Sequence, residues 1–341
     1  MTEREKIMSV SRRFWAMTAS AGLVLLNACS SGPTGQTTSI PSPTATASET
    51  AGHNHGQKIN INNAILSELD KLEAKLGIPA LSNQIQASRP YGSTEELVSK
   101  NVLSQEQFDR IKDMVTIEEV VLEGEAKDVD YMTKLGLMKG HLIVAKELLA
   151  LKKPSEAEPH IGHPVEEIYA DVEDQLGERG VKDFKTTLIS LQDLVKAGAK
   201  DSGKVNTEFT GSLSAIDTAI AALPDSQRRD PKFILQVING LLDTANSEYT
   251  ASIANGKISA AIEYQDSRGF VLYAEELYKN IAPEIEKRDP SAAKEIEKTL
   301  TELKTAWPSV EPPATPVKTP EQVTGLIKAI EKSSTALTKK S

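Results

Sequence analysis

The sequence predicts an all-α protein in which a small helical module is followed by a duplicated helical-bundle body. From about residue 120 onward, apolar residues recur with the period of an α-helix, and no alternating strand pattern interrupts them. Before that point, shorter helical patterns at 64–73, 79–88 and 104–115 are separated by Gly-Ile-Pro and Pro-Tyr-Gly, which favour turns. An eleven-residue stretch of the body also recurs further along the chain. Together these observations predict helices packed on helices.

The N-terminal 28 residues have the layout of a secretory signal peptide. Arg12 and Arg13 precede the apolar run FWAMTASAGLVLL, which is too short to span a bilayer permanently. The following LNAC, which ends at Cys29, resembles the bacterial lipobox. That resemblance implies cleavage before Cys29 and lipidation of the cysteine. The alternative is an uncleaved signal anchor with an incidental cysteine.

Cys29 also bears on the compartment. It is the only cysteine in 341 residues, so no intrachain disulfide can form. We expect a lipid-anchored protein of the cell envelope that faces the periplasm or the cell surface. Ser30 resembles the outer-membrane sorting pattern, and SRRFW at 11–15 resembles a twin-arginine signal. Export by the general secretory route and by the twin-arginine route both stay open.

Residues 29–57 are predicted to be a disordered tether. They are rich in Ser, Thr, Pro and Gly and cannot bury enough apolar surface to offset the entropy of ordering. His53 and His55 lie in this tether, where they could capture copper or zinc loosely or simply be solvated. Without residues 1–28 the chain has 35 Lys+Arg and 46 Asp+Glu, a net charge of −11. This charge disfavours a polyanion as partner.

Residues 58–117 carry the marks of a compact hairpin module. Ile59-Asn60-Ile61-Asn62 precedes the first helix, Leu76-Gly77-Ile78-Pro79 forms the hairpin, and Ser82 and Ile85 keep the spacing of the second helix. The later Pro90-Tyr91-Gly92 and Glu96-Leu97 continue the pattern. In these residues the chain resembles the helix-hairpin-helix domain of the competence protein ComEA and of the photosystem II extrinsic protein PsbU. The resemblance implies either DNA binding or docking to a protein partner.

Two features of the module favour the protein partner. DNA-binding hairpins use Gly-Ile-Gly-Pro, whose second glycine lets backbone N–H groups approach a phosphate. Here Ile78 runs directly into Pro79, which has no N–H. The module also has seven Lys+Arg and eight Asp+Glu, so it offers little counterion release. DNA binding stays open if Lys71, Lys75 and Arg89 share one face.

The body is predicted to contain two bundle repeats, at 120–223 and 230–337. The stretch KGHLIVAKELL at 139–149 aligns with RGFVLYAEELY at 268–278, an offset of 129 residues. Helices are expected at 128–150, 164–178, 181–199, 203–223, 230–252 and 320–337. His163-Pro164 and Asp289-Pro290 are matching helix starts, each a cap followed by proline. A repeat seen twice predicts pseudo-twofold bundles.

The histidines outside the tether are confined to the first repeat. His141, His160 and His163 lie within 23 residues, while the second repeat has Phe270 where the first has His141. Glu167 follows His163 by one helical turn. Imidazoles with a carboxylate are donors for zinc, copper or iron inside a bundle. We predict a metal site made by His141, His160, His163 and Glu167.

Structural roles are the alternative for the same residues. His163 could cap the helix that starts at Pro164, with Glu166 completing a capping box. His141, at the edge of the apolar stripe, could be a hydrogen-bonded core histidine. In the second repeat, we interpret the polar run EYQDSR at 263–268 as the solvated face of a long helix.

No motif of a phosphate-binding loop, a serine hydrolase or a zinc protease occurs in the chain. Lipid-anchored duplicated bundles resemble the imelysin-like iron-associated family in layout, but its GxHxxE motif is not reproduced at Gly140-His141. We expect a non-enzymatic envelope protein for binding or scaffolding, with a metal or cofactor in the first bundle. The alternative is a surface DNA-binding protein that acts through its hairpin module. A metal-dependent enzyme is a third possibility, for which the sequence shows no general base.

Overall fold

The computed structural model describes residues 58–119 and 121–339. The predicted signal peptide, Cys29, the tether and its two histidines lie outside these residues. Helices dominate the described part of the chain, where extended structure is limited to two short two-stranded ladders. The all-α fold class is therefore confirmed. None of the described helices is long and apolar enough to cross a membrane.

The module has a hydrophobic core of its own. Its elements are β1 (Ile59–Asn60), α1 (Leu66–Leu76), α2 (Leu81–Ala87), α3 (Glu96–Ser99), α4 (Gln105–Asp109) and β2 (Val115–Thr116). The two strands pair in parallel and hold the ends of the module together. Leu69, Leu72, Leu81 and Ile85 are fully buried in its core. Its relation to ComEA and PsbU stays a prediction.

The helix predicted at 104–115 is mostly wrong. Only α4 forms there, with the Ser104 hydroxyl accepting from the Gln107 amide at its start. After Asp109 the chain tightens into turns, in which the Ile111 amide donates to the Phe108 carbonyl. These turns bury Ile111 and leave Val115 free to pair with β1. Tertiary packing thus overrides the helical pattern.

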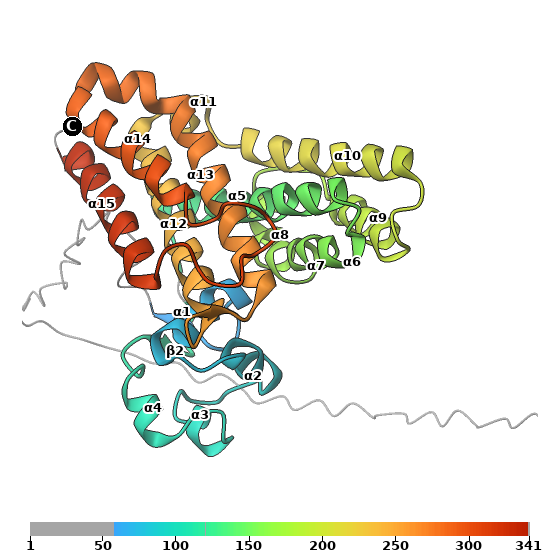
Figure 1. Ribbon diagram of the computed structural model, residues 1–341, viewed down its shortest axis with the longest axis vertical. Helices are drawn as coiled ribbons and strands as arrows, with labels where there is room; N and C mark the ends of the chain where they lie inside the picture. The colour runs from blue at the N-terminus through green and yellow to red at the C-terminus, as the bar shows by residue number, and fades with distance from the viewer. Residues whose placement is uncertain (1–57, 120, 340–341) are drawn as a thin grey trace, which may run out of the picture. The chain divides into compact units, whose positions relative to one another are not determined.

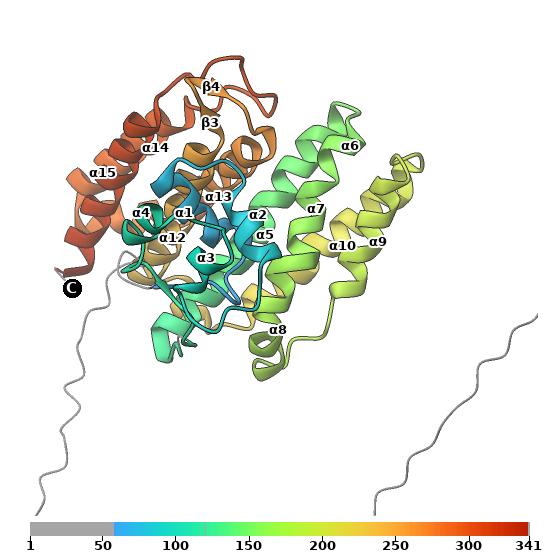
Figure 2. The same cartoon turned by 90° about the horizontal axis from the view of Figure 1, so that it is seen from below.

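Two groups of helices make up the body (Figures 1 and 2). The first contains α5 (Gly124–Ala150), α6 (Pro154–Ala157), α7 (Pro159–His163), the π-helical turn η1 (Pro164–Ile168), α8 (Tyr169–Glu178), α9 (Lys185–Lys196) and α10 (Ser202–Ala221). The second contains α11 (Asp225–Arg228), α12 (Pro231–Ala251), the hairpin β3 (Ile253–Ala254) and β4 (Lys257–Ile258), α13 (Ala261–Arg288), α14 (Pro290–Lys304) and α15 (Pro320–Lys339). One continuous hydrophobic core serves both groups.

The two groups meet where α5 crosses α13. A β-carbon added to Gly269 would lie 2.2 Å from the carbonyl oxygen of Gly140, so the two backbones touch. Beside this contact the rings of His141 and Phe270 pack edge to face, with centroids 5.0 Å apart. These two pairs are the positions that the 129-residue offset equates. The repeat itself stays a prediction, but its equivalent residues form the crossing.

Candidate metal centre

His141 lies in the middle of α5, on the side that faces α13. Its side chain is 1% exposed, so it is a core residue rather than one at the edge of the apolar stripe. Its Nδ1 is 2.6 Å from Oδ1 of Asp266 on α13. The close glycine crossing brings α13 near enough for this contact. His141 is thus held by a carboxylate from the other half of the body.

His160 and His163 both belong to α7, because the helix begins at Pro159 rather than at Pro164. His163 has helical backbone angles and makes no side-chain cap, so the capping interpretation is wrong. Pro164 costs the helix a hydrogen bond, and the chain accommodates it by widening into η1. His160 is fully buried, whereas the His163 side chain is 28% exposed.

The interpretation of residues 263–268 as a solvated face is wrong. Tyr264, Gln265, Asp266 and Ser267 are all buried against the first helical group and the connector after α14. Arg268 makes a two-pronged ion pair with Glu147 of α5, at 2.8 and 2.9 Å. The polar run is therefore an interior hydrogen-bonding surface.

Asp266 is the centre of the histidine cluster. Its Oδ1 lies 2.6 Å from Nδ1 of both His141 and His160, and its Oδ2 lies 3.4 Å from Nδ1 of His163. The ring centroid of His141 is 6.5 Å from that of His160 and 5.3 Å from that of His163. The structure therefore brings the three predicted histidines together around a carboxylate that the sequence did not single out.

Gln265 fixes which nitrogen of His160 carries a proton. Its amide nitrogen donates to the carbonyl oxygen of Val310 at 3.2 Å, so its Oε1 must face His160. That oxygen can only accept, and it lies 2.9 Å from His160 Nε2, which therefore donates. The remaining Nδ1 then meets Asp266 either as a second N–H or as a lone pair. Two lone pairs 2.6 Å apart require a cation between them, either a proton or a metal ion.

One nitrogen of the cluster has no hydrogen bond. Nε2 of His141 is buried and has no partner among the described residues. Buried polar atoms are almost always paired, and an orphan indicates strain or a missing ligand. In addition, His141, His163 and Asp266 each offer a ligand atom, and these atoms lie within 4.8 Å of one another. The donors thus fit a borderline divalent metal.

The charges in the cluster are divided between its members. Burial lowers the pKa of His141 in spite of the Asp266 charge. Burial also opposes protonation of His163, but its hydrogen bond to Asp266 and the negative charge of that group raise its pKa to about 9. Although burial acts in the opposite sense, His141 and His160 hold the pKa of Asp266 well below its usual range. Asp266 is therefore an anion at neutral pH.

Glu167, the carboxylate predicted as a ligand, lies beside the cluster on η1. Its Oε2 accepts a hydrogen bond from the Leu66 backbone at 3.2 Å, and its charge acts on His163. Asp266 occupies the central position instead. The 129-residue offset equates Asp266 with Leu137, which is buried in the core. That alignment was the signal that could have identified Asp266 as an interior residue.

The hairpin of the module is occupied from within. At the start of α2 the Glu73 carboxylate accepts hydrogen bonds from the Ala80 amide at 2.9 Å, the Ser82 amide at 3.3 Å and the Ser82 hydroxyl at 2.9 Å. These are the donors that a phosphate would need. The basic residues are also dispersed, since Lys71 pairs with Asp243 and Arg89 donates to the Ile61 and Ala64 carbonyls.

We expect the chain to bind duplex DNA weakly at physiological salt. The Glu73 carboxylate already takes the hairpin amides, and the cations do not form one face. Fluorescence anisotropy with a labelled duplex, repeated across salt concentrations, measures this. Tight binding with a steep loss of affinity as salt increases would contradict the expectation.

Similarity to known proteins is confined to the C-terminal part of the chain. The family model of the iron permease-associated 4-helix bundle domain matches residues 224–341. No curated protein and no solved structure matches the chain. The matched region includes α11 to α15 and therefore Asp266, but not the three histidines of the cluster. From Pro224 onward, the chain is thus similar to a four-helix bundle domain associated with iron permeases.

Proposed function

We propose that this chain is a lipid-anchored, metal-binding protein of the cell envelope, which holds one divalent transition metal between α5, α7 and α13. The observation that carries the proposal is the convergence of three imidazoles on Asp266, with a buried imidazole nitrogen left unpaired. Imidazole and carboxylate donors suit iron, zinc and copper. The anchoring at Cys29 rests on the lipobox-like sequence.

Iron is the first candidate among these metals. The domain that resembles residues 224–341 is described as associated with an iron permease, and those residues supply Asp266. The same description favours a permease as the protein partner, and the metal would then be cargo rather than a resident cofactor. Partial exposure of His163 gives the metal a side from which to enter and leave.

Metal binding should raise the thermal stability of the protein. A ligand that binds only the folded state stabilises it by about 2.7 kcal/mol at a hundredfold excess over its dissociation constant. The test uses the chain from residue 29 with Cys29→Ser, titrated anaerobically with Fe²⁺ and separately with Zn²⁺, and followed by thermal unfolding. His163→Ala should abolish the rise. The rise should be larger at pH 8 than at pH 6, because imidazole ligates metals only when deprotonated.

The double variant His53→Ala/His55→Ala is the matched control, because it removes two imidazoles outside the cluster. It should show the same metal-dependent rise as the parent chain. A rise that survives His163→Ala, or one that disappears with the two tether histidines, would move the binding site elsewhere and refute the proposal.

A further inference from the structure

The module meets the body through α1. Ile65, just before this helix, is buried in the core of the body rather than in that of the module. Further along, the Lys71 ammonium lies 2.6 Å from the Asp243 carboxylate of α12, against which α1 packs. The module is therefore fixed on the body by an apolar residue and an ion pair.

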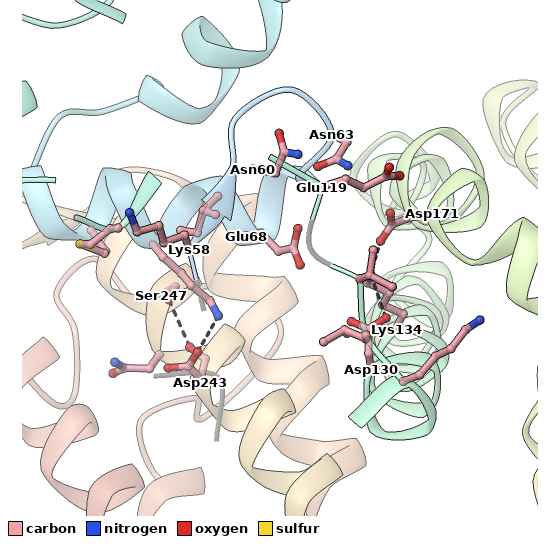
Figure 3. Close-up of a pocket in the computed structure, with 18 of the residues that line it drawn as sticks. Lys58, Asn60, Asn63, Glu68, Glu119, Asp130, Lys134, Asp171, Asp243 and Ser247 are labelled. Atoms are coloured by element: carbon pink, nitrogen blue, oxygen red, sulfur yellow. Dashed lines mark hydrogen bonds and ion pairs between the residues drawn. The ribbon is translucent and has the colours of Figure 1, made fainter. Parts of the chain in front are cut away.

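On another side, a polar pocket of about 740 Å³ lies between α1 and the helices α5 and α8. Figure 3 shows Glu68 of α1 opposite Lys134 and Asp171, which form an ion pair. Asp171 stands one turn beyond Glu167 on the same helical segment. Because the pocket is open and polar, individual hydrogen bonds near it can be removed without collapsing a packed core.

The first residue of α1 reaches the metal centre. The backbone N–H of Leu66 has no acceptor within its own helix, as is usual for the first turn. It donates to Oε2 of Glu167 at 3.2 Å. Glu167 lies one turn after His163, and its negative charge acts on that imidazole. The module thus holds one oxygen of a carboxylate that stands beside the cluster.

We infer that the module completes the metal site, because the Leu66 amide positions the Glu167 carboxylate toward the metal beside His163. This inference rests on the proposed function. It assigns to Leu66 a positioning role through its backbone alone. Because coupling between sites is reciprocal, the metal should in turn strengthen the attachment of the module to the body.

Leu66 allows a sharp test, because proline at this position removes the N–H and little else. It is the first residue of α1, where proline is favoured, and the preceding Ile65 has extended angles (φ −69°, ψ 164°) that proline requires. Leu66→Pro abolishes the hydrogen bond to Glu167. Leu66→Ala also removes the leucine side chain but keeps the N–H, so it is the matched control.

The dissociation constant for Zn²⁺, measured by isothermal titration calorimetry on the chain with Cys29→Ser, is the readout. Leu66→Pro should weaken binding about tenfold relative to Leu66→Ala, which should bind within about twofold of the parent. Equal affinities of the two variants would overturn the inference while leaving the proposed function intact. A parent chain that binds no Zn²⁺ would refute both.

A second variant covers poor folding of Leu66→Pro, which circular dichroism would reveal. Glu167→Gln keeps an oxygen that can accept from Leu66 but removes the negative charge beside His163. It should weaken Zn²⁺ binding by a similar factor. Binding equal to that of the parent chain would show that Glu167 has no part in the site and would overturn the inference.

Discussion

Gly269→Ala should lower the free energy of unfolding by at least about 3 kcal/mol. The new β-carbon would lie 2.2 Å from the Gly140 carbonyl oxygen and 2.7 Å from its carbonyl carbon. Both are backbone atoms, so no side chain can turn aside to make room. The helices α5 and α13 would have to separate, which loosens the shared core and draws His141 away from Asp266. Urea unfolding followed by circular dichroism measures the change.

Gly325→Ala is the control for this substitution. Gly325 is an exposed residue within α15, and a β-carbon there would meet nothing within 4 Å. Alanine should leave stability unchanged or raise it by up to about 1 kcal/mol, because glycine is the weaker helix former. If Gly269→Ala unfolded within about 1 kcal/mol of the parent chain, the close crossing of α5 and α13 would be refuted.

The stability of the protein should fall as the pH rises from about 4 to about 7. The buried carboxyl groups of Asp70 on α1 and Glu248 on α12 hydrogen-bond each other, which requires that one of them carries a proton. Burial raises the pKa of Asp70 to about 7, from an ordinary value of 3.8. Burial and the adjacent Asp70 raise that of Glu248 well above its usual range.

The direction of the change follows from proton binding. Between pH 3.8 and about 7 the folded state holds a proton that the unfolded chain has released, so stability declines as pH rises. For Asp70 alone the decline amounts to about 4 kcal/mol, since one pKa unit is worth about 1.4 kcal/mol. The other groups facing this pair are the hydroxyls of Ser67 and Ser82 and the carboxyls of Glu73, Glu263 and Asp266.

Asp70→Asn should remove most of this pH dependence. An amide supplies a permanent donor to Glu248, so the variant should be more stable than the parent chain at pH 8 and no more stable at pH 4.5. Urea unfolding at several pH values between these limits tests the difference. Asp113→Asn, an exposed substitution in the same module, should follow the parent curve. Parallel curves for Asp70→Asn and the parent would show that the carboxyl pair does not share a proton.

Helical periodicity predicted most of the body well, because long amphipathic helices carry their burial pattern in the sequence. The helix expected at 230–252 is α12 (Pro231–Ala251), and the one expected at 203–223 is α10 (Ser202–Ala221). Asp289 caps α14 through the Ala292 amide, as the Asp-Pro signal predicted. The similar His-Pro signal failed at 163–164, because a proline can also sit inside a helix that widens around it.

The metal centre was predictable only in part. Clustering in the sequence pointed to His141, His160 and His163, since two of them share a short helix. Asp266 lies more than a hundred residues away, and a polar residue on a long helix gives no sign of burial unless its partner is known. The internal hydrogen bonds of Glu73 were hidden for the same reason, because they depend on how the hairpin folds back.

The division of the donors between the two halves of the chain affects what relatives can inherit. Asp266 belongs to the region that resembles the iron permease-associated bundle, whereas the histidines come from helices upstream of it. A relative that shares only residues 224–341 would carry the acid without its three bases. In such a protein an aspartate at this position would be buried without a counter-charge, and selection should replace it with an apolar residue. Aspartate at position 266 and the upstream histidines should therefore be gained and lost together during evolution.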